Sequence, residues 1–319
     1  MRQIFIILFS ITAFTAFGQS KTKVFTSDID RFWQAYDSVF TTKDTLKQLA
    51  FVQTLYLDKA TKGLKEFMES REHSAKRHLN NIINFPKFWI SVRPHTLDIN
   101  SHVPAIEKIM GDFKVLYPPF DQPEVYFTIG VLNSGGTTTK DKILIGSEIA
   151  SADSTVDASE IGSWLQAVFK DNENVVYLVA HEAVHTQQNE TGSGTAKDPP
   201  TLLEYCIAEG SCDFIAELLL KQPIISPYMT YGKANEADLW EVFQKEMYGP
   251  EYRNWLYNGA DAPGGHADLG YFIGYAICKA YYDTSTDKPK AIKEIIDLDY
   301  TKKALQEFLE KSGYNGGQK

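Results

Sequence analysis

The feature that most constrains this chain is a pair of histidines four residues apart at the end of an apolar stretch. His181 and His185 belong to the pentapeptide His-Glu-Ala-Val-His, which directly follows the apolar residues 175–180. Residues four apart on a helix project from one face, about 40° apart around the axis. Both imidazoles can then bind one zinc ion, and Glu182 can reach a water on that ion. The pattern predicts a helix that carries part of a metal site.

The apolar first turns of this helix indicate that its histidines enter the protein interior, with Asn172 or Asn174 as the N-cap. A buried imidazole needs a hydrogen-bond partner. The alternative to a metal site is therefore a pair of core histidines that donate to carbonyl groups. Two such histidines with a glutamate between them favour the metal site.

A zinc site of the catalytic type needs a third protein ligand. Residues 201–220 predict one helix with a single interior glycine, Gly210. Its four acidic residues are Glu204, Glu209, Asp213 and Glu217. Glu209 comes 24 residues after the second histidine, which leaves room for a loop and a returning helix. Asp213 follows at i+4 on the same face, where it can accept a hydrogen bond from a ligand imidazole and fix its tautomer.

Two other glutamates of this helix stay as alternatives. Glu217 lies two turns beyond Glu209 on nearly the same face and is the runner-up for the third ligand. Glu204 lies about 140° around the helix from Glu209, where it is either solvated or bonded elsewhere. Gly210, beside Glu209, would let the two ligand helices approach closely.

The His181-Glu182-x-x-His185 motif, followed by Glu209 and Asp213, resembles the glutamate-zincin, or thermolysin-like, metallopeptidase pattern. The wider stretch of about residues 85–310 resembles a family of predicted secreted zinc-dependent proteases of unknown role. That wider likeness depends on residues 128–130, 143–146, 255–257 and 270–275 beside the zinc motif. One departure is Gln187, because zincin helices usually have an apolar residue two positions after the second histidine.

The resemblance implies an α+β fold that is predominantly helical, with a zincin-like catalytic core, a small β-sheet or hairpin, and an N-terminal helical region. It implies a zinc metallopeptidase that hydrolyses peptide bonds in a peptide or protein substrate. Zn²⁺ would be held by the two histidines and Glu209, and Glu182 would be the general base. Tyr271 or His266 would stabilise the oxyanion, with Tyr275 as a further candidate. Tyr271 and Tyr275 have core packing as their alternative role.

Two rival functions remain open at this stage. The first is a catalytically inactive zincin-fold protein that acts in binding or assembly outside the cytoplasm. The second is a zinc hydrolase that acts on something other than peptide bonds. The intact motif favours the peptidase over the first rival.

The N-terminal residues predict export. Residues 1–18 read as a cleavable signal peptide, with Arg2 before an apolar run too short to span a bilayer comfortably. The expected location is therefore secreted or periplasmic. No cysteine follows the expected cut, so a lipid anchor is not suggested, and no later segment predicts a membrane span.

The net charge of −9 disfavours nucleic acid and anionic membranes as partners. The three cysteines predict buried free thiols, although Cys278 could pair with either of the other two.

The rest of the chain predicts helices around one β-rich region. After the signal, residues 19–118 predict an N-terminal helical region, and residues 119–319 predict the zincin-like metallopeptidase region. Residues 125–131 and 142–146 predict a hairpin with a longer loop. By the resemblance, residues 142–146 or their partner strand would be an edge strand that pairs with peptide. Residues 191–200 predict a flexible loop between the two ligand helices.

Overall fold

The structure is a computed structural model that describes residues 23–171, 175–190 and 199–317. The expected signal peptide, the candidate N-caps Asn172 and Asn174, and most of the expected loop at 191–200 lie outside the described residues. None of the described helices is long and apolar enough to cross a membrane.

The elements follow one another in three groups along the chain. The first group is β1 (Val24–Phe25), α1 (Ser27–Val39), α2 (Thr45–Phe51), η1 (Val52–Tyr56), η2 (Leu57–Lys59), α3 (Lys62–Ser70), α4 (Ala75–Asn84), α5 (Pro86–Leu97) and α6 (Ile99–Leu116). The second is β2 (Glu124–Thr128), β3 (Gly136–Thr139), β4 (Lys142–Gly146), α7 (Ser147–Ala150), α8 (Ser163–Asp171) and α9 (Val175–His185). The third is α10 (Leu202–Leu220), α11 (Pro227–Ala234), α12 (Glu236–Glu246), η3 (Gly259–Asp261), η4 (Pro263–Gly265), α13 (Leu269–Thr284), α14 (Lys288–Ile296) and α15 (Lys302–Ser312).

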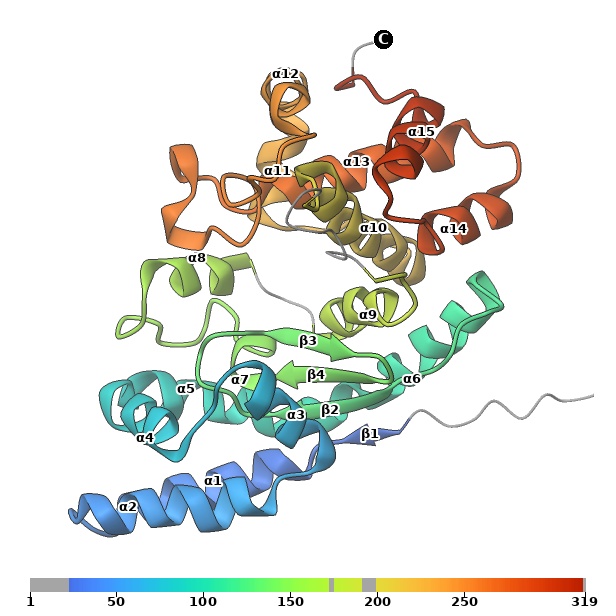
Figure 1. Ribbon diagram of the computed structural model, residues 1–319. Coiled ribbons are helices and arrows are strands. Elements are labelled where there is room, and N and C mark those ends of the chain that lie inside the picture. Colours follow the sequence, from blue (N-terminus) through green and yellow to red (C-terminus); the bar gives the residue numbers. More distant parts are fainter. Residues whose placement is uncertain (1–22, 172–174, 191–198, 318–319) are drawn as a thin grey trace, which may run out of the picture.

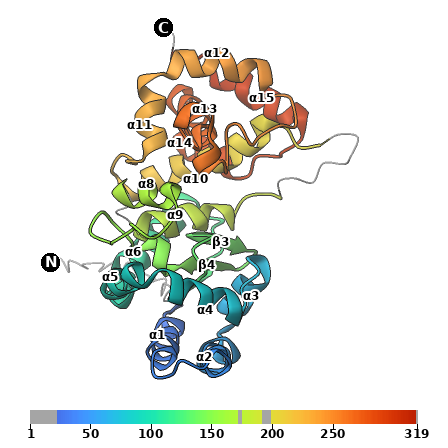
Figure 2. The same ribbon diagram turned by 90° about the vertical axis from the view of Figure 1, so that its left-hand side faces the viewer.

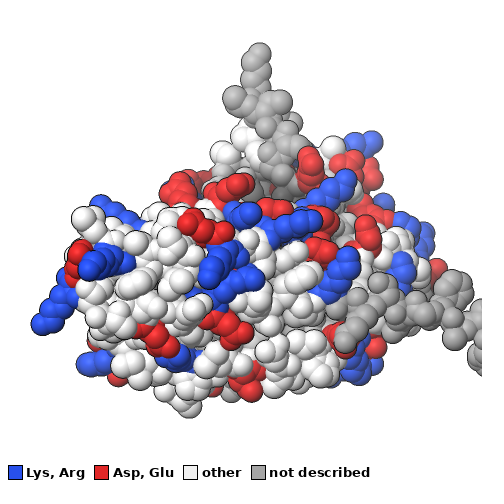
Figure 3. Space-filling model, turned by 90° about the horizontal axis from the view of Figure 1, so that it is seen from below, with Lys and Arg blue, Asp and Glu red and all other residues white. Residues whose placement is uncertain are grey.

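The described chain is predominantly helical with one small sheet, which confirms the predicted α+β class. The N-terminal region is helical as expected, apart from the two residues of β1. The sheet lies in the middle of the molecule (Figures 1 and 2). α3 packs on the face that carries Tyr126 and Leu144, α1 contacts β2, and α9 contacts β3 and β4. A continuous apolar core extends from Ile29 in α1 to Leu309 in α15. On the face seen in Figure 3, acidic and basic side chains are interspersed.

The sheet differs from the predicted hairpin. β2 and β4 are neighbours but run parallel, with Val125 opposite Ile143, and the sheet order is β1-β2-β4-β3. The chain leaves β2, forms β3 at the far edge, and returns antiparallel as β4 between them. β3 is Gly-Thr-Thr-Thr and half-buried throughout, so it lacks the apolar alternation that would have revealed it. The expected edge strand, at residues 142–146 or at their partner 125–131, is therefore wrong, because β4 and β2 are both internal and β3 is the edge beside α9.

Helices α10 and α13 cross at two glycines. A Cβ on Gly274 would lie 1.6 Å from the backbone oxygen of Cys206, and a Cβ on Gly210 would lie 2.0 Å from the backbone nitrogen of Tyr275. Gly210 faces α13 and not the histidine helix as expected. The backbones touch because neither glycine has a side chain, and no rotamer change could relieve the clash that a Cβ would cause.

We expect Gly274→Ala to lower the free energy of unfolding by about 3 kcal/mol or more, because the new methyl group meets backbone and must push the two helices apart. Urea unfolding followed by circular dichroism measures the change. Gly162→Ala is the matched control, since a Cβ there meets nothing within 4 Å, and its effect should stay within about 0.5 kcal/mol. Equal stability of the two variants would show that α10 and α13 do not cross at these glycines.

Candidate metal centre

Helix α9 presents both histidines of the motif to the interior. It begins in an apolar run and is nearly all buried, with His181 6% and Glu182 8% exposed. Burial along most of its length follows from its position between the sheet and α10. The prediction of a helix that carries the histidines into the protein is confirmed.

Helix α10 returns across α9 and supplies the acids. Its N-cap is Thr201, whose side-chain oxygen accepts the backbone N–H of Glu204. The helix extends to Leu220 as predicted, with Lys221 in the left-handed conformation at its C-cap. Both Glu209 and Asp213 are buried, and they lie one turn apart on the face towards α9.

The carboxylate of Glu209 contacts both predicted histidine ligands. Glu209 Oε2 lies 3.3 Å from His181 Nε2 and 3.2 Å from His185 Nε2. Four ligands arranged tetrahedrally about 2.0–2.2 Å from zinc are separated by roughly 3.3–3.6 Å, so these two spacings match two edges of a zinc tetrahedron. Two imidazole nitrogens and one carboxylate oxygen are also a donor set that zinc accepts. The residues present therefore fit the ion.

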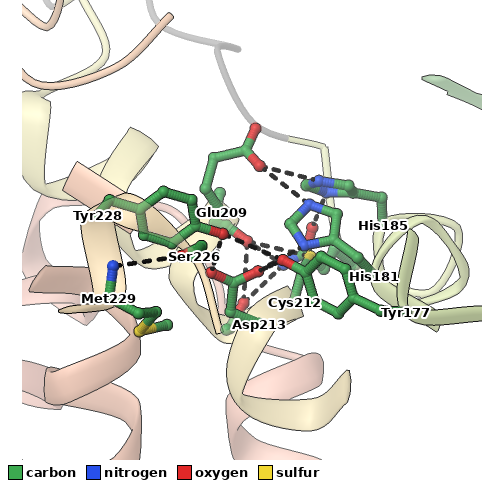
Figure 4. A network of polar contacts seen from close by, with 12 residues as sticks. Tyr177, His181, His185, Glu209, Cys212, Asp213, Ser226, Tyr228 and Met229 are labelled. Atoms are coloured by element: carbon green, nitrogen blue, oxygen red, sulfur yellow. Dashed lines mark hydrogen bonds and ion pairs between the residues drawn. The ribbon is translucent and has the colours of Figure 1, made fainter. Parts of the chain in front are cut away.

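Asp213 organises a buried network behind His181, shown in Figure 4. The imidazole Nδ1 of His181 lies 2.8 Å from Asp213 Oδ1, which leaves Nε2 facing Glu209. The hydroxyl of Tyr177 donates to Asp213 Oδ1 at 2.6 Å, and that of Tyr228 donates to Asp213 Oδ2 at 3.0 Å. The carboxylate thus fixes the ring orientation of His181 and is itself held by two phenols. The sequence indicated Asp213, but it missed Tyr177, one turn before His181, and Tyr228.

His185 is oriented by a glutamine one turn further on. Its Nδ1 lies 2.8 Å from Gln188 Oε1, and Gln188 Nε2 donates to Ala208 O and to Ser211 Oγ, both at 2.8 Å. Gln188 therefore joins the end of α9 to α10 and leaves His185 Nε2 free to face Glu209. The i, i+3 spacing from His185 was the available sequence signal for this residue.

The site concentrates opposite charges in a buried place. Burial opposes the charge on His181, but hydrogen bonds to Asp213 and Glu209 outweigh it and hold the pKa of the imidazole well above its usual value. Burial likewise opposes ionisation of Glu209, but His185 and His181 hold the pKa of its carboxyl well below the usual value. Burial raises the pKa of Glu182. Glu209 is thus ionised where the imidazoles meet, which is the state that a metal ligand requires.

The alternative ligands are engaged elsewhere. Glu217 accepts the Tyr275 hydroxyl at 2.8 Å and the backbone N–H of Ile224 at 3.3 Å. Glu204 is 6% exposed, so the solvated position weighed for it is wrong. The Cys212 sulfur is near the two imidazoles, within 4.8 Å of one ring nitrogen of each. Its thiol, however, donates to Ala208 O at 3.3 Å, and burial keeps its pKa well above the usual value. Glu209, whose carboxylate contacts both imidazoles, therefore stays the candidate for the third ligand.

All three cysteines are free and buried, as predicted from their number.

The aromatic residues expected near the site are divided between two places. The Tyr271 ring lies 6.1 Å from the His181 ring, and Tyr271 is therefore beside the site. His266 is exposed and stacks on Tyr231 at 3.5 Å between centroids, away from the converging ligands. Tyr275 is in the core, 3% exposed. The sequence missed Tyr257, whose hydroxyl donates to Glu209 Oε1.

The edge strand β3 covers Glu182. A Cβ on Gly136 would lie 2.7 Å from Glu182 Oε1, so the absence of a side chain at Gly136 makes room for this carboxylate.

Gln187, the departure from the zincin pattern, binds the backbone of Asp121 through both ends of its amide at 2.8 Å. The polar residue at that position therefore ties α9 to the segment between α6 and β2.

The loop that leads to β3 is held by a buried glutamate. Glu148 is 0% exposed and accepts the backbone N–H groups of Gly130 at 2.8 Å and Leu132 at 3.2 Å. Burial raises the pKa of its carboxyl to about 7, although both hydrogen bonds oppose the rise. Buried His73 lies close to the same loop, and burial lowers its pKa to about 4.

The chain was compared with known protein families, curated proteins and solved structures. A family model described as gliding motility protein GldB matches residues 19–316. The chain belongs to this family. No curated protein and no solved structure matches it. The short name of the GldB model marks lipoproteins, which indicates association with the cell envelope.

Membership of the GldB family corrects the functional prediction. The resemblance to glutamate-zincin metallopeptidases is wrong as a family assignment, and the predicted hydrolase activity on peptide or protein substrates is wrong with it. The GldB match covers nearly the whole chain, whereas the resemblance depended on the pentapeptide, Glu209 and Asp213, and four short stretches between residues 128 and 275. Such a motif specifies how a helix presents two imidazoles, and it does not specify what the metal does. We therefore assign no catalytic role to Glu182, Tyr271 or His266.

We expect Asp213→Ala to lower the free energy of unfolding by about 3–5 kcal/mol, because it leaves two buried phenols and one buried imidazole without their acceptor. Chemical denaturation measures it. Asp283→Ala removes an acid of α13 that is 53% exposed and forms an ion pair with Lys279, and it should change the stability by less than about 0.5 kcal/mol. A similar small effect of Asp213→Ala would contradict the network.

We expect Glu148 to make stability fall as the pH rises. Its pKa is about 7 in the folded chain and 4.5 as the reference value, so the folded state keeps a proton that the unfolded state releases. The stabilisation that the protonated carboxyl of Glu148 provides is complete below about pH 4.5 and is lost by about pH 7. This loss lowers the free energy of unfolding by up to about 3 kcal/mol. Glu148→Gln does not titrate, so the difference in unfolding free energy between wild type and variant should shift against wild type over this range. A constant difference would refute the raised pKa.

Proposed function

We propose that the chain is a non-catalytic component of the gliding machinery that acts at the extracytoplasmic side of the cell envelope. The observation that carries this proposal is the GldB family match over residues 19–316. The expected signal sequence and the lipoprotein name of the family both favour a place outside the cytoplasm. A motility protein works together with other proteins, so we infer a role in assembly or binding and not in turnover of a substrate.

In this proposal the converging residues form a structural zinc centre. His181 and His185 from α9 and Glu209 from α10 would hold the ion in a zincin-like arrangement of two helices beside an edge strand. Zinc would supply a bond between the two helices that is stronger than their hydrogen bonds, and this would stabilise the folded state by binding energy. The preset ring orientations support the proposal, because Asp213 and Gln188 already turn both Nε2 atoms towards Glu209.

In this proposal the zinc centre would lie where it can hold the molecule together. α9 contacts β3 and β4 on one side and α10 on the other, and α10 in turn packs on α13 through the glycine crossing. A metal bond between α9 and α10 would therefore join the sheet layer to the C-terminal helices. A rigid junction of this kind suits a protein that presents fixed surfaces to partners.

The proposal separates the metal ligands from Glu182. We expect His181→Ala, His185→Ala and Glu209→Ala to lose a metal content of close to one zinc per chain and to reduce gliding when they replace the wild-type chain in cells. Glu182→Gln should keep zinc, fold and gliding, because only hydrolysis would need this carboxylate as a base. Glu217→Ala is the matched control on the same helix and should keep the metal.

Elemental analysis of the purified proteins measures zinc, and spreading of colonies on agar measures gliding. Full zinc content in the histidine variants would refute the ligand assignment. Loss of gliding in Glu182→Gln, with zinc and stability unchanged, would refute the non-catalytic role.

A further inference from the structure

A cavity of about 660 Å³ opens next to the metal centre. It lies between α8, the segment that follows α10, and the turns before α13. Its wall is mainly apolar and includes Trp164, Val168, Leu220, Ile224 and Ile225. The volume is in the range of pockets that enclose most of a ligand. None of these residues belongs to the metal ligands, so the cavity is a separate site.

The apolar surface continues beyond the rim of the cavity. Ile225 is 75% exposed and Trp164 is 37% exposed, although both are large side chains that line the opening. An occupant that covers both must be larger than the cavity itself. A polypeptide meets this need, since one large side chain can enter while its neighbours lie on the rim.

The polar end of the cavity carries one acidic group. Tyr177 and Tyr228 also line this wall, but their hydroxyls donate to Asp213 and lie 3.1 Å from each other. Asp268 is the one acidic residue among the described residues that line the cavity, and the lining includes no Lys or Arg. The wall therefore complements a donor or a positive charge and repels an anionic group.

We propose that this cavity binds a segment of a partner polypeptide in which a large apolar side chain stands beside Lys or Arg. The apolar side chain fills the space lined by Val168, Leu220 and Ile224, and the cation approaches Asp268. This inference deepens the proposed function, because it rests on an assembly role and names the chemistry of the partner. The net charge of −9 of the whole chain favours a basic partner as well.

Two substitutions probe the two halves of the site. Asp268→Asn removes the charge and preserves the shape, and asparagine tolerates the left-handed conformation that Asp268 adopts at φ 60°. Asp261→Asn, at an exposed residue that does not line the cavity, is its matched control. Ala167→Phe fills the cavity from an exposed position of its wall, where the new ring displaces no core residue.

Isothermal titration of the purified chain with three peptides tests the proposal. The first is acetyl-Lys-Leu-Phe-Leu-Lys-amide, the second has Glu for both Lys, and the third has Ser for Leu and Phe. We expect the first to bind and each of the others to bind at least tenfold more weakly. Asp268→Asn should weaken binding of the first peptide about five- to tenfold, Ala167→Phe should abolish it, and Asp261→Asn should leave it unchanged.

Equal affinity for the Lys and Glu peptides, or unchanged binding in Asp268→Asn and Ala167→Phe, would overturn the proposal. Binding of phosphatidylglycerol vesicles that Ala167→Phe abolishes, without binding of the first peptide, would make the occupant a lipid and overturn it too. Failure of this proposal can be distinguished from failure of the proposed function. Peptide binding can fail while zinc and gliding depend on His181 and His185, and the ligand variants can glide normally while the peptide still binds.

Discussion

The close crossing of α10 and α13 is the constraint on which the rest of the site depends. Because Gly210 and Gly274 remove the side chains between the two backbones, α10 is fixed against the C-terminal helices on one face. A neighbouring face of α10, about 60–100° around the helix from Gly210, then presents Glu209 and Asp213 to α9. With side chains at the glycine positions, α10 would stand several ångströms further from α13, and its acids would no longer meet both imidazoles. The polar geometry of the centre is thus set by an apolar, side-chain-free contact behind it.

Much of the site could be predicted because its information is local. The spacing of His181 and His185, and of Glu209 and Asp213, depends only on helical periodicity, and long apolar runs made both helices clear. The partners that come from elsewhere, Tyr228 and Tyr257, could not be found, because nothing in their own segments marks a contact with α10. Tyr177 and Gln188 were visible at i−4 and i+3 from the histidines, but a motif search that ends at its last histidine passes over them.

The sheet and the function were mispredicted for different reasons. The hairpin was expected because β2 and β4 are both apolar and near in sequence, whereas the strand between them, β3, is made of Gly and Thr and has little apolar signal. The functional prediction was wrong because a metal-binding pattern constrains geometry and leaves the use of the metal open. Glu182 illustrates this point. It stands beside the histidines in sequence, yet in the structure it lies against Gly136 of β3. The motif gives no sign of this contact.

The pairing of β1 with β2 has a consequence for how the chain folds. Val24 is opposite Val125, so about a hundred residues must be brought into a loop before this edge of the sheet can close. The contacts between α9 and α10 span far less, from His185 to Glu209 and from His181 to Asp213. Short loops close at a lower entropic cost and earlier than long ones. We therefore expect the histidine and acid helices to meet first, and the two residues of β1 to dock last onto a sheet that is already formed.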